Sequence, residues 1–497
     1  MHRVTLPPVL AFRRPARVWA LALAIGLIAG VLPADAGPQQ PSSVIPADPR
    51  QMRFPPVDFK PPEPDRVVLD NGIIVYLLED HELPLITITA TMRTGSWLDP
   101  ADKVGLAGLV GHTMRTGGTQ TMTAAQVDEE LERIAAQVSV GIGTESGAAS
   151  LDVLKKDLDR GLQIFADILL KPAFEPARVE LARLQAIEGI RRRKDRPQSI
   201  IGREFAKLVY GAEHPYARES TVQSVSRITR EDLQRFHAQT IHPNGVWLGV
   251  TGDFDKARML EALRKVFGGW ARGEVPAIVL PQLGEDGAAV RTVRWVGKHT
   301  SQTHLRVGHL SIKEDDPDYP ALSLLNDILG GSSFRSRLFQ DVRTQRGLAY
   351  SVGSALRTGM RERGLWLMRA ETKLESTQEV ISRLVANMER LREQPVRDEE
   401  LEEAKEAFIN SFVFSFTSPS AIVSRLIGLE YDGLPKDFLQ QLRDKVVKLT
   451  KEDLLRAAQK HLHPERLRIL ALGPPETLSR TLQAFGEAKE MKVEPEG

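Results

Sequence analysis

Hydrophobic and polar positions first follow the two-residue period of β-strands. Residues 66–78 form two apolar runs separated by Asn71-Gly72, a pair that favours the tight turn of a β-hairpin. Residues 85–92 alternate in the same way, and residues 246–250 form a continuous apolar strand. Helix-like spacing occupies three longer segments, residues 105–117, 123–136 and 156–196. Strands and helices mix without strict alternation, which predicts an α+β fold.

An internal repeat divides the chain into two parts. Residues 228–233 recur as residues 449–454, at an offset of 221 positions. The His-Pro pairs at 242–243 and 463–464 share this offset. Each copy predicts a Thr-capped helix with an acidic first turn, a break at His-Pro, and then an apolar strand. The repeat therefore predicts two homologous α+β halves of about 210 residues each.

The N-terminus has the pattern of a secretory signal peptide. Residues 1–36 contain four arginines, an apolar run of 15 residues, and Ala34-Asp35-Ala36 as the cleavage site. We expect export to the periplasm with cleavage after Ala36. The alternative is an uncleaved anchor, although 15 apolar residues are short for a spanning helix. The mature chain is expected to have no stable membrane span.

Composition narrows the classes of partner and ligand. Removal of residues 1–36 takes away four basic and one acidic residue, which leaves 62 basic and 64 acidic residues. The net charge is therefore close to zero and gives no positive electrostatic potential that would attract nucleic acid, so no nucleic-acid partner is expected. Cysteine is absent, which excludes disulfides and thiolate ligands.

Composition shifts and the repeat together predict the domain boundaries. A Pro-rich arm covers 37–64, the N-terminal half 65–275, a Pro- and Gly-rich linker 276–289, and the C-terminal half 290–490.

The segment from Gly105 to Thr119 begins with Gly-Leu-Ala-Gly-Leu-Val-Gly-His. It predicts a helix that ends at Gly117-Gly118. It resembles the metal-binding helix of the pitrilysin/insulinase family of zinc peptidases, in its processing-peptidase branch, where it reads G-L-A-H-x-x-E-H. That inverted motif places two histidines on one helical face, with the Glu between them as general base. Here Gly108 replaces the first His and Gly111 replaces the Glu, so that only His112 remains.

The resemblance also implies a third ligand, a Glu in a later helix. Matching Ile190 and Pro197 to the family pattern puts Gly189 at the ligand position, whereas a slip of one residue would make it Glu188. A catalytic zinc needs three protein ligands, so we expect this chain to bind no zinc and to lack peptidase activity alone. Alternatively, the glycines at 105, 108 and 111 serve close packing of a neighbouring element.

The C-terminal half contains a second segment with a family resemblance. Residues 335–352 look like the S-R-L-F…L-R-x-x-x-G-L-A-Y pattern, in which an Arg and a Tyr seven residues apart reach toward the zinc site. Arg343 and Tyr350 match this pair. The resemblance implies that they bind the substrate carbonyl and the developing oxyanion, for which both are suitable donors. The alternative is a structural role, with Arg343 capping a helix end and Tyr350 beginning a strand.

The resemblance implies two α+β halves that face each other as a clamshell around a substrate chamber. We expect a non-catalytic subunit of a heteromeric periplasmic zinc metallopeptidase, in a heterodimer with a sister subunit that carries H-x-x-E-H and the zinc. An extended peptide would bind by adding a strand to a sheet edge. Two alternatives stay open: a structural or peptide-binding protein without peptidase activity, and an enzyme whose metal is held by His112, Glu188 and a third residue.

Overall fold

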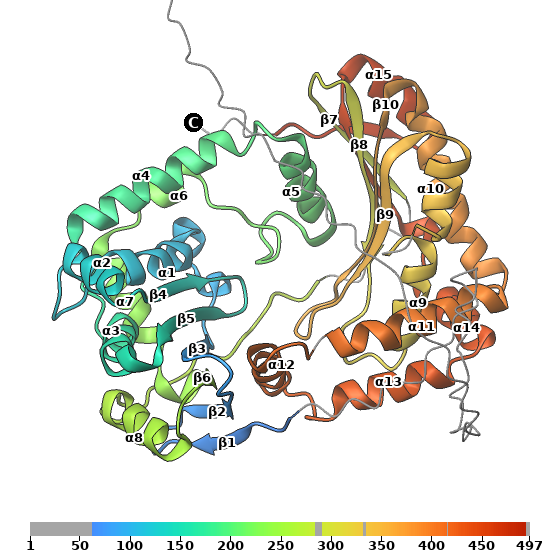
Figure 1. The fold of residues 1–497 in the computed structure, drawn as a ribbon. Helices are drawn as coiled ribbons and strands as arrows, with labels where there is room; N and C mark the ends of the chain where they lie inside the picture. Colours follow the sequence, from blue (N-terminus) through green and yellow to red (C-terminus); the bar gives the residue numbers. More distant parts are fainter. Residues whose placement is uncertain (1–61, 284–290, 332–333, 415, 494–497) are drawn as a thin grey trace, which may run out of the picture. The chain divides into compact units, whose positions relative to one another are not determined.

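The computed structural model describes residues 62–283, 291–331, 334–414 and 416–493 (Figure 1). The predicted signal peptide, most of the predicted arm and the end of the predicted linker lie outside these ranges, so their boundaries stay predictions. Among the described helices, none has the length and apolar character needed to cross a membrane.

The first half contains these strands and α-helices in chain order: β1 (Asp65–Val68), β2 (Ile74–Glu79), β3 (Leu85–Met92), α1 (Leu106–Thr116), α2 (Ala124–Arg133), β4 (Gln137–Ile142), β5 (Gly147–Leu154), α3 (Leu158–Leu170), α4 (Pro176–Arg192), α5 (Pro197–Tyr210), α6 (Val222–Ser226), α7 (Arg230–Thr240), β6 (Val246–Gly252) and α8 (Lys256–Phe267).

The second half contains these: β7 (Thr292–Gly297), β8 (Gln302–Leu310), α9 (Tyr319–Leu329), β9 (Ala349–Arg357), β10 (Leu365–Lys373), α10 (Thr377–Glu393), α11 (Asp398–Phe414), α12 (Pro419–Tyr431), α13 (Phe438–Lys448), α14 (Lys451–His461), β11 (Arg468–Gly473), α15 (Pro475–Thr481) and β12 (Ala488–Glu490).

The two halves build their sheets in the same order. The first sheet runs β1-β2-β6-β3-β5-β4 and the second runs β12-β7-β11-β8-β10-β9. The strand that follows the repeated helix in each half, β6 or β11, inserts parallel to β2 or β7 and antiparallel to β3 or β8. The outermost strands differ, since β1 is antiparallel to its neighbour and β12 is parallel. The predicted α+β class with two homologous halves is confirmed.

Local sequence signals account for several element ends. The β1–β2 hairpin turns at Asn71-Gly72, and Gly72 has a φ of 93°, in the left-handed region that glycine adopts without strain. Strand β3 has the predicted bounds. The repeated helix starts are matching capping boxes, Thr229 with Asp232 in α7 and Thr450 with Asp453 in α14.

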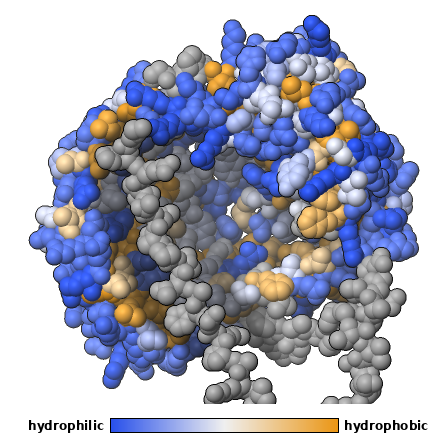
Figure 2. All heavy atoms as spheres, turned by 45° about the horizontal axis from the view of Figure 1, so that its top comes forward, coloured by the Kyte–Doolittle hydropathy of each residue, from blue (hydrophilic) through white to orange (hydrophobic). Residues whose placement is uncertain are grey.

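One face of each sheet packs against helices of its own half. In the first half, α1 and α3 cover this face over an apolar core that includes Ile88, Val110 and Leu151. In the second half, α9, α10 and α14 cover the equivalent face (Figure 1). Polar side chains cover most of the visible surface, with apolar side chains in separate patches (Figure 2). Burial of these two cores is the main favourable term in folding each half.

The other face of each sheet receives a helix from the opposite half. Helix α5 packs on β8 and β11 of the second sheet, and α12 packs on β2 and β6 of the first. Gly249 in β6 permits this approach, because a Cβ there would lie 2.5 Å from a methyl group of Val423 in α12. Both helices begin with proline, Pro197 and Pro419, about one repeat apart. The halves are therefore joined by a reciprocal exchange of helices.

Polar contacts reinforce this exchange. Arg66 donates two hydrogen bonds to the carboxylate of Glu430 in α12, at 2.7 and 2.9 Å. Arg361, in the turn between β9 and β10, pairs with Asp432 at 3.0 Å and with Glu145 of the first half at 3.5 Å. Its guanidinium also lies 4.8 Å from the ring centroid of Tyr431, a cation–π distance.

Candidate functional site: a degenerate metal helix and a stacked Arg–Tyr pair

A buried carboxylate fixes the start of helix α1. Asp99 accepts hydrogen bonds from the backbone N–H groups of Gly105 and Ala107, both at 2.8 Å. Gly105 precedes the helix with a φ of 109°, a conformation that a side chain would strain. The helix ends at Gly117, as predicted. These contacts set the position of the degenerate motif inside the helix.

The three motif positions of α1 have different surroundings. Gly108 and His112 are four residues apart and share an exposed face of the helix. Gly111 is buried against β4, where a Cβ would lie 2.7 Å from the backbone nitrogen of Ile142 and 3.0 Å from the carbonyl carbon of Gly141. A Cβ at Gly108 would meet nothing within 4 Å. The packing interpretation therefore holds for Gly111 and is wrong for Gly108.

Both candidates for the third ligand lie on the exposed side of α4, which packs beside α1. The carboxylate of Glu188 is paired with Arg192 at 2.6 Å. Gly189 has open space where a side chain would begin. If the alignment is shifted by one residue, Glu188 takes the position of the third ligand. Its carboxylate is then already engaged in an ion pair with Arg192 of the same helix.

The donors at these positions do not fit a catalytic zinc, which needs three protein ligands. His112 is the only imidazole, and neither Gly108 nor Gly111 has a side chain. Within the described ranges, one group of His, Asp and Glu has metal-like spacing: Asp316, Asp318 and His461, in the second half. It does not contain His112 or Glu188, so the different-metal alternative receives no support from the described residues. Asp318 is also already paired with Arg456, Lys460 and His461.

The structure brings Arg343 and Tyr350 together. Arg343 lies in a π-helical segment (Phe339–Gln345), and its guanidinium carbon is 4.7 Å from the ring centroids of both Phe339 and Tyr350. Tyr350 follows the first residue of β9, and 78% of its surface is exposed. Neither side chain forms a hydrogen bond or ion pair with another described residue. The guanidinium N–H groups and the phenol O–H of this pair are therefore available as donors.

A buried carboxylate anchors the segment that holds Arg343. Asp341 accepts hydrogen bonds from Arg383 at 2.8 and 2.9 Å, from Arg346 at 2.8 Å and from Asn387 at 2.7 Å. Burial raises the pKa of Asp341, but these hydrogen bonds outweigh it and lower the pKa to about 2. Sequence reasoning missed Asp341, although an aspartate two residues before Arg343 in an arginine-rich segment was a usable signal.

The other arginines of this segment have structural partners. Arg337 forms a two-pronged ion pair with Glu400 of α11, at 2.8 and 2.9 Å. Arg335 pairs with Glu403 on the same helix at 2.6 Å. Arg343 is thus distinguished by stacking on aromatic rings where its neighbours bind carboxylates.

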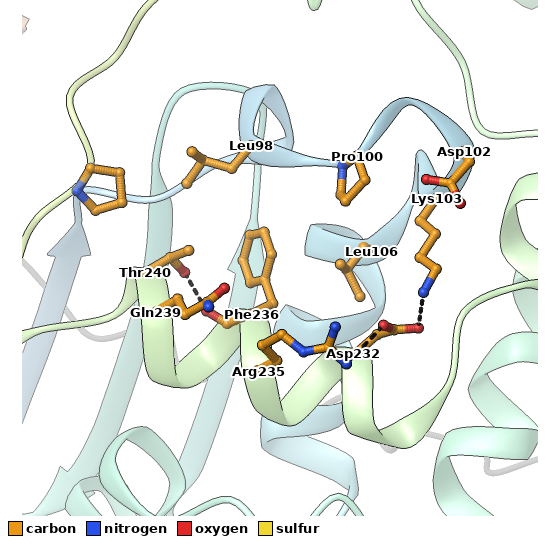
Figure 3. A pocket seen from close by; sticks show the side chains of 11 residues that line it. Leu98, Pro100, Asp102, Lys103, Leu106, Asp232, Arg235, Phe236, Gln239 and Thr240 are labelled. Atoms are coloured by element: carbon orange, nitrogen blue, oxygen red, sulfur yellow. Dashed lines mark hydrogen bonds and ion pairs between the residues drawn. The ribbon is translucent and has the colours of Figure 1, made fainter.

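A cavity of about 380 Å³ lies beside the start of α1 and contains none of the predicted site residues (Figure 3). Lys103 lines one side of it and pairs with Asp232 of α7 at 2.6 Å (Figure 3). The hydroxyl of Thr240 donates to the backbone of its own helix at 2.9 Å. Lys103 and Thr240 are therefore already paired within the protein.

Two family profiles match successive parts of the chain. Residues 75–214 match "Insulinase (Peptidase family M16)", and residues 227–408 match "Peptidase M16 inactive domain". The chain belongs to the insulinase family. The second description applies to residues 227–408, which do not include the glycines of α1.

Similar proteins match most of this chain in sequence or in fold. An uncharacterized zinc protease of Bacillus subtilis is 25% identical over 362 residues, which are 72% of this chain and 86% of that protein. The crystal structure of a peptidase M16 inactive domain from Pseudomonas fluorescens is 27% identical, covers 83% of this chain and 98% of its own, and has a TM-score of 0.74. The periplasmic protease PqqL from Escherichia coli, at 16% identity and a TM-score of 0.70, covers 89% of this chain and 49% of its own and shows the fold alone.

Proposed function

We propose that this insulinase-family protein is the non-catalytic subunit of a heteromeric periplasmic zinc metallopeptidase. One contrast carries the proposal: the metal helix keeps only His112 and has lost its base, whereas Arg343 remains stacked on the exposed Tyr350 in the other half. At position 111 the packing itself excludes the general base, because backbone atoms of β4 lie too close to Gly111 for the side chain of a Glu to begin there. The sister subunit would carry the intact H-x-x-E-H and the zinc.

Arg343 and Tyr350 would act on the peptide that the sister subunit cleaves. When a peptide carbonyl is attacked, negative charge develops on its oxygen, and a guanidinium N–H and a phenol O–H can each donate a hydrogen bond to it. Stacking between Phe339 and Tyr350 holds the guanidinium plane before the substrate arrives. Fixed donors of this kind stabilise charge without having to reorganise during the reaction.

The strand that carries Tyr350 can also hold the peptide. Strand β9 ends the second sheet and pairs with β10 alone among the described strands. Its outer edge presents backbone N–H and C=O groups, to which an extended peptide can add as a further strand, as far as Ser354, whose N–H is already bonded to the carbonyl oxygen of Gly330 at 2.8 Å. Main-chain hydrogen bonds of this kind provide affinity with little demand on sequence.

The test uses the complete mature chain mixed with its sister subunit. Arg343→Ala is expected to lower kcat of the mixture by about 100-fold, the loss typical of removing an oxyanion donor. Tyr350→Phe removes one hydroxyl and should lower kcat by about tenfold. Thr344→Ala, an exposed neighbour in the same segment, is the matched control and should leave the rate unchanged. Binding of each variant to the sister subunit is measured in parallel.

Two outcomes would contradict the proposal. Full activity of the Arg343→Ala and Tyr350→Phe mixtures would show that the two side chains take no part in cleavage. A chain that forms homodimers, binds peptides and associates with no peptidase would favour the alternative, a peptide-binding protein without enzymatic function.

A further inference from the structure

The face of the second sheet that receives α5 carries a row of arginines. Arg306 of β8 lies directly opposite Arg369 of β10, so both side chains project from the same face. Arg294 of β7 stands in the same row on the other side of Leu470. Arg357 of β9 is on this face as well, opposite Leu365. The four guanidinium groups come from four different strands, so only the sheet brings them together.

Helix α5 covers only the apolar part of this face. Ile201 and Phe205 of α5 pack with Leu470 and Leu472, together with other leucines of the same sheet. Arg357 and Arg369 are exposed, and Arg306 is partly buried. The face is therefore divided into a covered apolar region and an uncovered cationic region.

This cationic region lacks the acidic partners that arginines have elsewhere in the chain. Like charges directly opposite each other destabilise a sheet. Burial and the facing Arg369 lower the pKa of Arg306. None of Arg306, Arg357 and Arg369 forms an ion pair with a carboxylate of the described residues. By contrast, Arg335, Arg337 and Arg346, which flank Arg343 in the sequence, each pair with a carboxylate.

One carboxylate does lie on the strands of this face. Glu371 follows Arg369 by two residues on β10 and faces His304, at 3.5 Å from its ring nitrogen. It also accepts a long hydrogen bond of 3.4 Å from Gln198 of α5. One negative charge beside three guanidinium groups leaves an excess of positive charge that an acidic ligand would offset.

The position of the row relates it to the Arg–Tyr pair. Arg369 lies opposite Gly353, which is three residues after Tyr350 on the edge strand β9. At about 3.4 Å per residue, this places the row about 10 Å along the strand from Tyr350. A peptide paired with the outer edge of β9 beside Tyr350 would lie two strand spacings, about 10 Å, from β10, so that one of its long side chains could meet that of Arg369.

We propose that Arg306, Arg357 and Arg369 form a subsite for carboxylate side chains, which selects peptides with Asp or Glu near the bond presented to the sister subunit. The proposal rests on the proposed function, since it assumes that the chain binds peptides. A guanidinium group is the natural partner of a carboxylate, because its planar N–H donors match the two oxygens.

The test measures binding to the isolated mature chain, without its sister subunit. Three fluorescent peptides of one sequence carry Glu, Gln or Lys at two central positions. We expect the Glu peptide to bind about tenfold more tightly than the Gln peptide, and the Lys peptide most weakly. The preference should shrink as the salt concentration rises, because salt screens exposed charges. Equal affinity for the Glu and Gln peptides would overturn the proposal.

Variants identify the side chains responsible. Arg369→Gln should reduce the preference for Glu over Gln to about threefold or less and leave the Gln peptide's affinity unchanged. Arg480→Gln is the matched control: it removes one exposed arginine from α15, whose Leu478 belongs to the core on the opposite face of the same sheet. Melting temperatures confirm that both variants fold. An unchanged preference in Arg369→Gln would contradict the assignment.

The two proposals can fail separately. If the Glu preference depends on Arg369 while Arg343→Ala leaves cleavage by the mixture intact, the subsite stands and the split active site does not. If the mixture depends on Arg343 but Glu and Gln peptides bind alike, the reverse holds. Tighter binding of a single-stranded oligonucleotide than of the Glu peptide would assign the arginines to nucleic acid and overturn the peptide subsite.

Discussion

Replacing single glycines by alanine separates the two explanations for the missing ligands. Gly108, Gly111 and Gly189 all stand where the family places a ligand or the base, but only Gly111 lacks room for a side chain. We therefore expect Gly111→Ala to destabilise the first half, and Gly108→Ala and Gly189→Ala to stabilise it. The three substitutions add the same methyl group to a helix, so intrinsic helix propensity favours all of them.

The expected sizes follow from the surroundings. At Gly108 and Gly189 nothing lies within 4 Å of the added Cβ, so the helix gains about 0.5–1 kcal/mol. At Gly111 the Cβ would lie 2.7 Å from a backbone atom of β4, which a side-chain rotation cannot relieve. Overpacking of this kind costs about 1–3 kcal/mol and exceeds the propensity gain. Subtracting the propensity gain leaves a net loss for Gly111→Ala of about 1 kcal/mol.

Calorimetric melting of the mature chain measures these differences. One kcal/mol corresponds to about 2–4 °C in a unit of 150–250 residues, so Gly111→Ala should lower Tm by about 2–4 °C. Gly108→Ala and Gly189→Ala should raise Tm by about 1–4 °C. If Gly111→Ala raises Tm as much as the other two, β4 does not restrict this helix, and the argument that packing excludes the general base is refuted.

Three further outcomes are expected. Hydrogen bonds to Asp341 hold its pKa at about 2, below the value of about 4 in the unfolded chain. The folded state therefore gains about 2 kcal/mol above about pH 4, and this stability is lost as the pH falls toward about 2. Asp341→Asn should remove this pH dependence, as measured by urea unfolding. Arg361→Ala removes the ion pair to Glu145 of the first half, together with the contacts to Asp432 and Tyr431 at the end of α12, which should separate the melting of the two halves in calorimetry, whereas a single unshifted transition would contradict this role. The isolated chain should hold far less than one zinc ion per molecule by elemental analysis and keep its Tm in EDTA; a stoichiometric, stabilising zinc would refute the degenerate site.

Local signals in the sequence predicted much of the fold. Asn71-Gly72 located the first hairpin because few other pairs adopt its turn. The capping boxes at Thr229 and Thr450 located two helix starts and revealed the repeat that the common strand order confirms. These signals succeed because each depends on residues only a few positions apart.

Features that depend on distant residues were not predicted. The sequence showed glycine at both 108 and 111, but whether β4 lies against one or the other is decided by a strand about thirty residues later. The arginine row needs the strand order, since Arg306 and Arg369 are neighbours only across a β8–β10 ladder. The stacking of Arg343 and Tyr350, by contrast, follows from a seven-residue spacing that the family resemblance already contained.

The exchange of α5 and α12 determines what a cut in the chain would do. A protease that nicks the segment joining the halves would not release two independent proteins, because each fragment would keep a helix seated on the sheet of the other. The fragments should stay associated without a covalent link. For the same reason, each half produced alone would leave an apolar sheet surface open to water and would be prone to aggregate.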